Sequence, residues 1–184
     1  MNTPRSKPPV RWTKPVRKAA SGKAAHWGIK DPEIAASLGF MISYWSQVEE
    51  RMIWFLNALL RGERDTTPVA MQAARLIFRS IAAESARIKV MTALLEMAPH
   101  NAERGQNFDE VLDEFSTLNH LRNKYVHGLW RTEVNESGSF GHVLLADPRQ
   151  DMSGHGAEHI VKATEINAVS GRMSRLFTKI GRCT

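Results

Sequence analysis

At 184 residues the chain is long enough for one globular domain with its own hydrophobic core, without a metal or a disulfide to stabilise it. Its single cysteine, Cys183, excludes a disulfide framework and a cysteine-based zinc site, and indicates a reducing compartment. No apolar run reaches the roughly 18 residues that a membrane span needs, and the first residues lack the apolar core of a secretory signal. We therefore expect a cytoplasmic protein with no membrane partner.

The formal charge of +6 is concentrated at the N-terminus. Residues 1–30 hold eight of the 25 Lys and Arg side chains and no acid, so the other 154 residues hold 17 basic and 19 acidic side chains. This composition predicts a flexible basic tail over residues 1–30 and one folded domain over residues 31–184. The tail could follow an RNA or DNA backbone, with Trp12 and Trp27 stacking on bases, or it could only keep the protein soluble.

The first predicted helix begins at Asp31 and Pro32, a capping side chain followed by a proline at the first helical position. From Leu38 to Leu59 apolar residues recur at steps of three and four, which is typical of an amphipathic helix. Five further apolar side chains widen this surface: Ile42, Ile53, Trp54, Leu56 and Leu60. For this wider surface we expect a second buried contact, with another subunit.

Thr67 and Pro68 repeat the same start signal, and the apolar spacing then continues until Pro99. The pattern predicts one long second helix over this range. Glu84 interrupts its apolar stripe. We interpret Glu84 as a carboxylate at the margin of the bundle that meets a positive side chain, in preference to a catalytic role.

Asn107 and Glu110 resemble a capping box and predict the start of a third helix, which Gly128 ends as a left-handed residue. After it the period changes to that of strands, and the segments 129–134 and 140–145 read as a β-hairpin. Thr164 then begins a last helix with one apolar side. The expected fold is all-α, an antiparallel up-and-down four-helix bundle with a small β-hairpin inserted before the last helix.

The end of the third helix carries the candidate site. Arg122 stands where an apolar residue is expected, so its charge needs a partner, either an acid or a phosphate. His127, five positions on, offers an imidazole, a group that exchanges protons near neutral pH. A guanidinium and an imidazole around a phosphodiester suffice for RNA cleavage without metal, because the ribose supplies the nucleophile. About 140° of helix separates the two positions, so either the long arginine side chain or a second copy of the helix across a two-fold axis would have to bring the groups together.

Arg122 and Asn123, then His127 and Gly128 at the end of a helix, resemble the R-x4-6-H motif of the HEPN superfamily, in which a polar residue commonly follows the arginine. The resemblance implies a homodimer with a shared cleft and a metal-independent endoribonuclease with no cofactor, acting as a toxin, in phage defence or in RNA processing. It also implies an antitoxin protein as partner if the chain is a toxin. The catalytic residues implied are Arg122, Asn123 and His127, with Tyr125 and His120 as substrate-binding neighbours.

Other members of the same family have lost catalysis, so a second interpretation stays open. In it the bundle binds nucleotide, RNA or a protein without turnover, Arg122 pairs with an internal acid, and His127 only caps carbonyl groups. A metal site is not expected. Gly154 and Gly156 argue against a helix that would align His155 and His159, and His120 and His127 lie about 10 Å apart along the helix.

Overall fold

The computed structural model of the chain describes residues 25–61, 67–97, 102–147 and 158–183. Within these ranges the chain is mainly helical and also forms a small antiparallel sheet. The helices are α1 (Pro32–Arg61), α2 (Pro68–Ser80), α3 (Glu84–Met97), α4 (Ala102–His127) and α6 (Ala163–Cys183). The strands are β1 (Ala25–Trp27), β2 (Leu129–Val134), β3 (Phe140–Ala146) and β4 (His159–Ile160).

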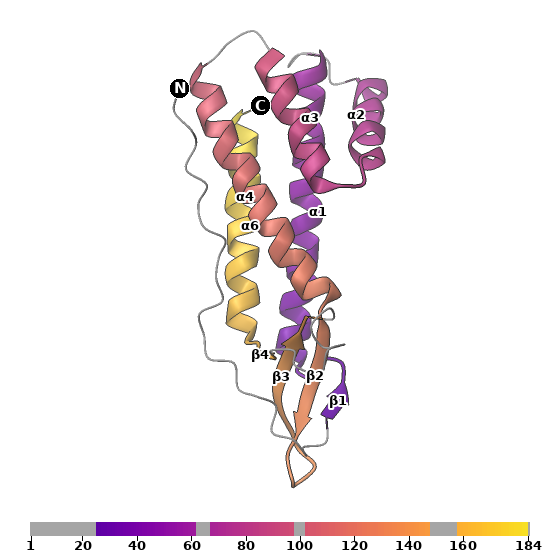
Figure 1. Cartoon of the computed structure of the whole chain (residues 1–184), viewed down its shortest axis with the longest axis vertical. Helices are drawn as coiled ribbons and strands as arrows, with labels where there is room; N and C mark the ends of the chain where they lie inside the picture. The colour runs from indigo at the N-terminus through magenta and orange to yellow at the C-terminus, as the bar shows by residue number, and fades with distance from the viewer. Residues whose placement is uncertain (1–24, 62–66, 98–101, 148–157, 184) are drawn as a thin grey trace.

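Three long helices make the body of the molecule (Figure 1). α1 and α6 both start beside the sheet and run parallel, whereas α4 crosses them in the opposite direction and ends at the sheet. Aromatic rings join α1 to α4 in the core: Trp45 stacks on Phe115 with ring centres 5.0 Å apart, and Phe55 on Phe108 at 4.0 Å. The apolar side of α6 closes the core with five buried side chains: Ile166, Val169, Met173, Leu176 and Ile180.

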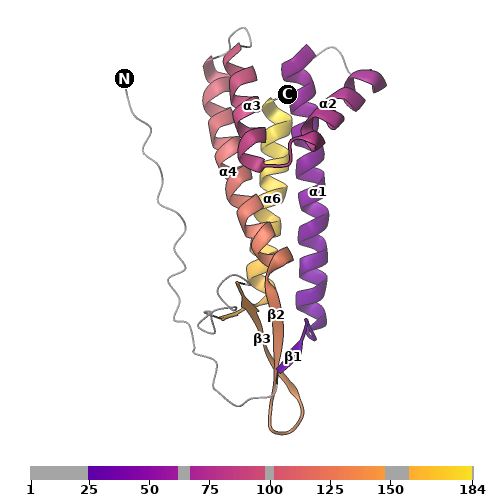
Figure 2. The same ribbon diagram turned by 45° about the vertical axis from the view of Figure 1, so that its right-hand side comes forward.

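The prediction of a mainly helical fold is confirmed, but the predicted up-and-down bundle of four helices is not what the chain forms. The segment from Pro68 to Met97 forms two helices, α2 and α3, joined by residues 81–83 in non-helical conformation. This extra reversal of the chain explains why the last helix runs parallel to the first. α2 packs on the outer side of α1 at the end far from the sheet, as the turned view shows (Figure 2).

No proline or glycine marks the break between α2 and α3, and the apolar spacing continues through it. Ile81 takes an extended conformation, with φ −84° and ψ 97°. Its carbonyl, freed from the helical ladder, accepts a 2.7 Å hydrogen bond from Nε of Arg87. The tertiary hydrogen bond compensates the carbonyl that a continuous helix would have satisfied.

Two of the predicted helix starts are confirmed by capping bonds. Asp31 accepts hydrogen bonds from the backbone nitrogens of Glu33 and Ile34, at 2.8 and 3.2 Å. Thr67 Oγ1 accepts from the nitrogen of Ala70 at 3.3 Å. The start predicted at Asn107 is wrong, because α4 already begins at Ala102.

The predicted hairpin is confirmed as β2 and β3, which pair antiparallel around a turn where Gly138 has φ +79°. The sheet is larger than expected, with the order β1-β2-β3-β4. Ala25–Trp27, placed by the sequence in the flexible tail, pairs as β1 with β2. Thr132, buried on β2, donates a 2.9 Å hydrogen bond to the carbonyl of Gly28, so the residues just before α1 are held by the sheet. The rest of the expected tail, residues 1–24, lies outside the described residues.

Gly128 ends α4 without the left-handed conformation that the sequence predicts. Among the described residues, positive φ values occur at Gly28 and Gly138. What requires glycine at position 128 is space, because a Cβ there would collide with Cδ1 of Leu145 and lie 2.6 Å from the carbonyl oxygen of Lys124. The end of α4 is thus pressed directly against β3.

Candidate functional site

The last turns of α4 carry the predicted motif. Arg122 is half-buried and donates a 2.7 Å hydrogen bond through Nη1 to the side-chain oxygen of its neighbour Asn123. Its Nε is buried and has no hydrogen-bond partner among the residues that the structure describes. The guanidinium is therefore fixed on one side by an amide and desolvated on another, which restricts its orientation.

His127 is the last residue of α4, and its side chain is exposed. The backbone beneath it is well held. The nitrogen of Gly128 donates to the carbonyl of Lys124 at 2.9 Å, and Nε1 of Trp130 donates to the carbonyl of Tyr125, also at 2.9 Å. The imidazole thus projects into solvent from a helix end whose backbone is fixed by these hydrogen bonds.

Arg122 and His127 do not meet within one chain. They are five positions apart on a continuous helix, which puts them about 140° apart around its axis. Asn123 stands between the two directions, four residues before His127 and therefore on the same side of the helix. A single chain thus presents Arg122 on one face of α4 and His127 on another.

The two neighbours expected to bind substrate lie in different environments. The ring of Tyr125 is 2% exposed and faces Trp130 with ring centres 6.3 Å apart, so it cannot stack on a base without leaving the core. Burial raises the pKa of Tyr125 to about 12, with a further contribution from the charge of Glu165. His120 is exposed, two helical turns before His127.

A group of charged side chains that the sequence did not single out lies beneath the motif, where α4, β3, β4 and α6 meet. Burial lowers the pKa of Lys124 to about 8, against the opposing charges of Asp147 and Glu165. His159 is 2.8 Å from Glu165. Lys124, His159 and Glu165 lie on α4, β4 and α6, and Asp147 directly follows β3, so no sequence spacing connects these groups. They attach the sheet to the end of the bundle.

Glu84 lies at the start of α3 and accepts a hydrogen bond from the side-chain amide of Asn119 on α4. The sequence predicts a positive partner for Glu84, but no ion pair joins it to a described Lys, Arg or His side chain. Its Oε1 is buried and makes no hydrogen bond with the described residues. One α3 turn further, Arg87 pairs with Glu49 of α1 at 3.5 Å. A polar layer therefore crosses from α1 through α3 to α4.

The exposed apolar surface of α1 is smaller than expected. Ile53 and Leu56, assigned by the sequence to a second contact, are buried in the core of the single chain. Trp54 remains 41% exposed, and Phe40 is 64% exposed beside Tyr44, which lies four residues on and so on the same face.

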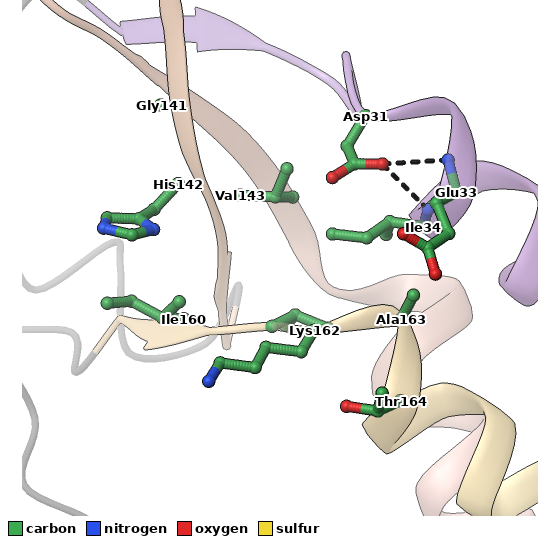
Figure 3. A pocket seen from close by; sticks show the side chains of 11 residues that line it. Asp31, Glu33, Ile34, Gly141, His142, Val143, Ile160, Lys162, Ala163 and Thr164 are labelled. Atoms are coloured by element: carbon green, nitrogen blue, oxygen red, sulfur yellow. Dashed lines mark hydrogen bonds between the residues drawn. The ribbon is translucent and has the colours of Figure 1, made fainter.

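A surface pocket of about 290 Å³ lies away from the motif, between the starts of α1 and α6 and the strands β3 and β4 (Figure 3). Asp31 lines it, and one of its carboxylate oxygens, Oδ1, accepts the two capping bonds of α1 (Figure 3). In the described residues no three His, Cys, Asp or Glu side chains gather closely enough to hold a metal ion. Of the helices in these same ranges, none has both the length and the apolar character to cross a membrane.

Comparisons of the chain with family models, with curated proteins and with solved structures give no match.

Proposed function

We propose that this protein is a metal-independent endoribonuclease of the HEPN type, which acts as a homodimer. The observation that carries the proposal is the hydrogen bond from Arg122 to Asn123 on the face of α4 that leads to the exposed His127. An oriented guanidinium recognises phosphate oxygens through two donors at once. An exposed imidazole at the same helix end supplies proton transfer.

The chemistry needs no group beyond these side chains and the RNA. The 2′-oxygen attacks the adjacent phosphorus, the bond from phosphorus to the 5′-oxygen breaks, and a 2′,3′-cyclic phosphate and a 5′-hydroxyl result. The imidazole of His127 accepts the proton of the 2′-hydroxyl and then donates a proton to the leaving 5′-oxygen. Arg122 stabilises the negative charge that grows on the phosphate oxygens in between.

Two chains supply what one chain lacks. A homodimer with α4 ends facing one another would place Arg122 of one protomer beside His127 of its partner. The exposed apolar side chains of α1, among them Phe40 and Trp54, offer surface for such an association. In the cell, the activity fits a toxin, phage-defence or RNA-processing role, and a toxin would require an antitoxin protein as partner.

Incubation of the purified protein with RNA in the presence of EDTA tests the proposal. We expect cleavage that leaves cyclic phosphate ends, and none of the corresponding DNA, which lacks the 2′-hydroxyl. Arg122→Ala and His127→Ala should each abolish cleavage, whereas His142→Ala, which removes an exposed histidine on β3, should leave it intact. Cleavage that survives both motif substitutions would identify a contaminating nuclease.

The second candidate is a module that binds RNA, nucleotide or protein without turnover. It is favoured by the surroundings of His127, whose ring makes no hydrogen bond with the described part of the chain that would orient it as a base. In that case the wild-type protein retards RNA in a gel shift but yields no cyclic phosphate product, and His127→Ala leaves the affinity unchanged.

A further inference from the structure

Trp27 presents an indole ring at the edge of the sheet. β1, which carries it, is the edge strand beside β2 (Figure 1). Arg131 lies opposite Trp27 in the register of the two strands, and its guanidinium lies over the ring, with Cζ 4.4 Å from the ring centre. Trp27 is nevertheless 62% exposed, so one face of its ring is covered and the other is open.

The cation beneath the ring is itself fixed. Nη1 of Arg131 donates a 2.9 Å hydrogen bond to Oε1 of Glu158, a buried carboxylate. Strand pairing and this ion pair hold the indole in place, so a ligand that stacks on it costs little further side-chain entropy. A rigid aromatic ring with one open face is a stacking platform.

The charges next to the platform favour a polyanion as its ligand. Residues 1–24, which directly precede β1 in the sequence, contain seven Lys and Arg side chains and no acid. Such side chains attract the phosphates of a nucleic acid, and the unpaired bases of a single strand offer flat faces that stack on an indole. A protein partner would need a wide apolar patch, but Leu144, in the same row across the sheet, is buried.

The platform also lies close to the motif. Arg131 follows His127 by four residues. Four residues of fully extended chain span at most about 14 Å. Stacked nucleotides rise about 3.4 Å each along one strand, so about four of them cover this distance. One RNA strand can therefore place a base on Trp27 and a phosphate at the imidazole.

Acidic side chains set the direction that this strand takes. Glu133 lies two residues beyond Arg131 on β2, and therefore on the same face of the sheet. Glu136 lies in the turn that follows. Both repel phosphate, and both are on the side of the platform away from His127. RNA that leaves Trp27 is thus directed along β2 toward the end of α4, and not toward the hairpin turn.

We propose that Trp27 is a base-stacking subsite for single-stranded RNA, which holds one unpaired base within about four nucleotides of the phosphate at His127. This proposal deepens the proposed function, and the part that it gives Trp27 in cleavage rests on that function. Tyr125, expected from the sequence to bind substrate, is buried in the core. Trp27 offers the open ring that Tyr125 does not.

Binding of an RNA probe that cannot be cleaved tests the subsite. The probe is a fluorescein-labelled oligomer of about twelve 2′-O-methyluridines, a length that one binding module covers. Its blocked 2′-oxygen cannot attack phosphorus. Fluorescence anisotropy with the full chain gives Kd, and Trp27→Ala should raise it about five- to a hundredfold, the loss of one stacked base. Phe140→Ala removes a ring that is 55% exposed near the hairpin turn and should leave Kd unchanged.

Trp27→Phe keeps the test decisive if Trp27→Ala does not fold. Stacking on a base quenches indole fluorescence, so the quenching that the probe causes in the wild type should be lost in Trp27→Phe. Undiminished quenching in Trp27→Phe would place the stacked ring elsewhere and overturn the inference. A wild type that does not bind the probe, or a folded Trp27→Ala with the wild-type Kd, overturns it too, as do equal losses in Trp27→Ala and Phe140→Ala.

Failure of the subsite and failure of the proposed function give different results. A protein that binds the probe through Trp27 and cleaves no RNA refutes the ribonuclease and leaves the subsite intact. A protein that cleaves RNA with the same KM in the wild type and in Trp27→Ala refutes only the subsite. If both proposals hold, Trp27→Ala should raise KM with little change in kcat, because stacking away from the reacting phosphate stabilises the bound substrate and the transition state equally.

Discussion

The side chain of Asn123 accepts a 2.7 Å hydrogen bond from Nη1 of Arg122, the residue just before it on α4. Adjacent helical residues diverge by about 100° around the axis, so the two side chains must bend toward each other to make this contact. The bond turns the guanidinium toward the side of the helix that His127 occupies. This contact is the basis for the role that we propose for Asn123.

Replacement of Asn123 by alanine should lower the cleavage rate without unfolding the protein. The lost hydrogen bond to a charged group corresponds to about 1.5–3 kcal/mol, or roughly ten- to a hundredfold in rate if it acts fully in the transition state. Initial rates on a fluorescent RNA measure this. Asn167→Ala, at an exposed position of α6, is the matched control and should have no effect. Equal rates for Asn123→Ala and the wild type would contradict the role of this amide.

Gly128→Ala should destabilise the protein by about 1–3 kcal/mol, because the added methyl group collides with Leu145 in a packed contact. Urea unfolding measures the change. Shortening the opposing side chain in a Gly128→Ala, Leu145→Ala double variant should make the effect of the glycine substitution smaller.

Gly39→Ala serves as its control. Gly39 lies inside α1, and no atom lies within 4 Å of the place that a Cβ would take, so alanine there should raise stability by about 0.5–1 kcal/mol. If both glycine substitutions stabilise the protein, the close approach of α4 and β3 is refuted.

The stability of the protein should rise with pH from about 8 to 10.5 through Lys124. Burial lowers the pKa of Lys124 from 10.5 to about 8. In that range the unfolded chain binds more protons at this side chain than the folded protein, so the free energy of unfolding increases as pH increases. Lys124→Gln should flatten this part of the profile. Chemical denaturation at a series of pH values measures it, and a profile that Lys124→Gln leaves unaltered would be inconsistent with the burial of this amine.

Tyr125 should have the opposite effect at higher pH. Its pKa is raised from 10.0 to about 12 by burial, so the folded protein keeps a proton that the unfolded chain loses. This contribution is fully present below pH 10 and is lost by about pH 12, with a limit of about 2–3 kcal/mol. Tyr125→Phe should remove the decline. A decline of the same size in Tyr125→Phe would assign the loss to other groups.

Local signals in the sequence predicted much of the fold. Asp31 and Thr67 were found because their capping bonds involve residues two or three positions away. The hairpin was found because its strands are long enough to show a period of two. β1 and β4 have three and two residues, too few for any period. The break before Glu84 was missed because it depends on a hydrogen bond from Arg87 and on no proline or glycine.

The candidate site was predicted only in its local part. The placement of Arg122, Asn123 and His127 at the end of a helix follows from spacing along one segment, and α4 does end there. The relation of Glu84 to this helix joins positions 35 residues apart and depends on how α3 packs on α4. Interruption of an apolar stripe by a carboxylate was the available signal, and it identified the residue but not its partner.

Subunit complementation tests the central claim most directly, because it asks whether Arg122 and His127 act across two chains. Arg122→Ala and His127→Ala, each inactive alone, are unfolded and refolded together so that mixed dimers form. If the site is shared, a mixed dimer holds one complete pair, and the mixture should regain about a quarter of the wild-type rate, since half of the dimers are mixed and each has one of two sites. A mixture that contains mixed dimers and cleaves no RNA, beside a wild type that does, would contradict the account.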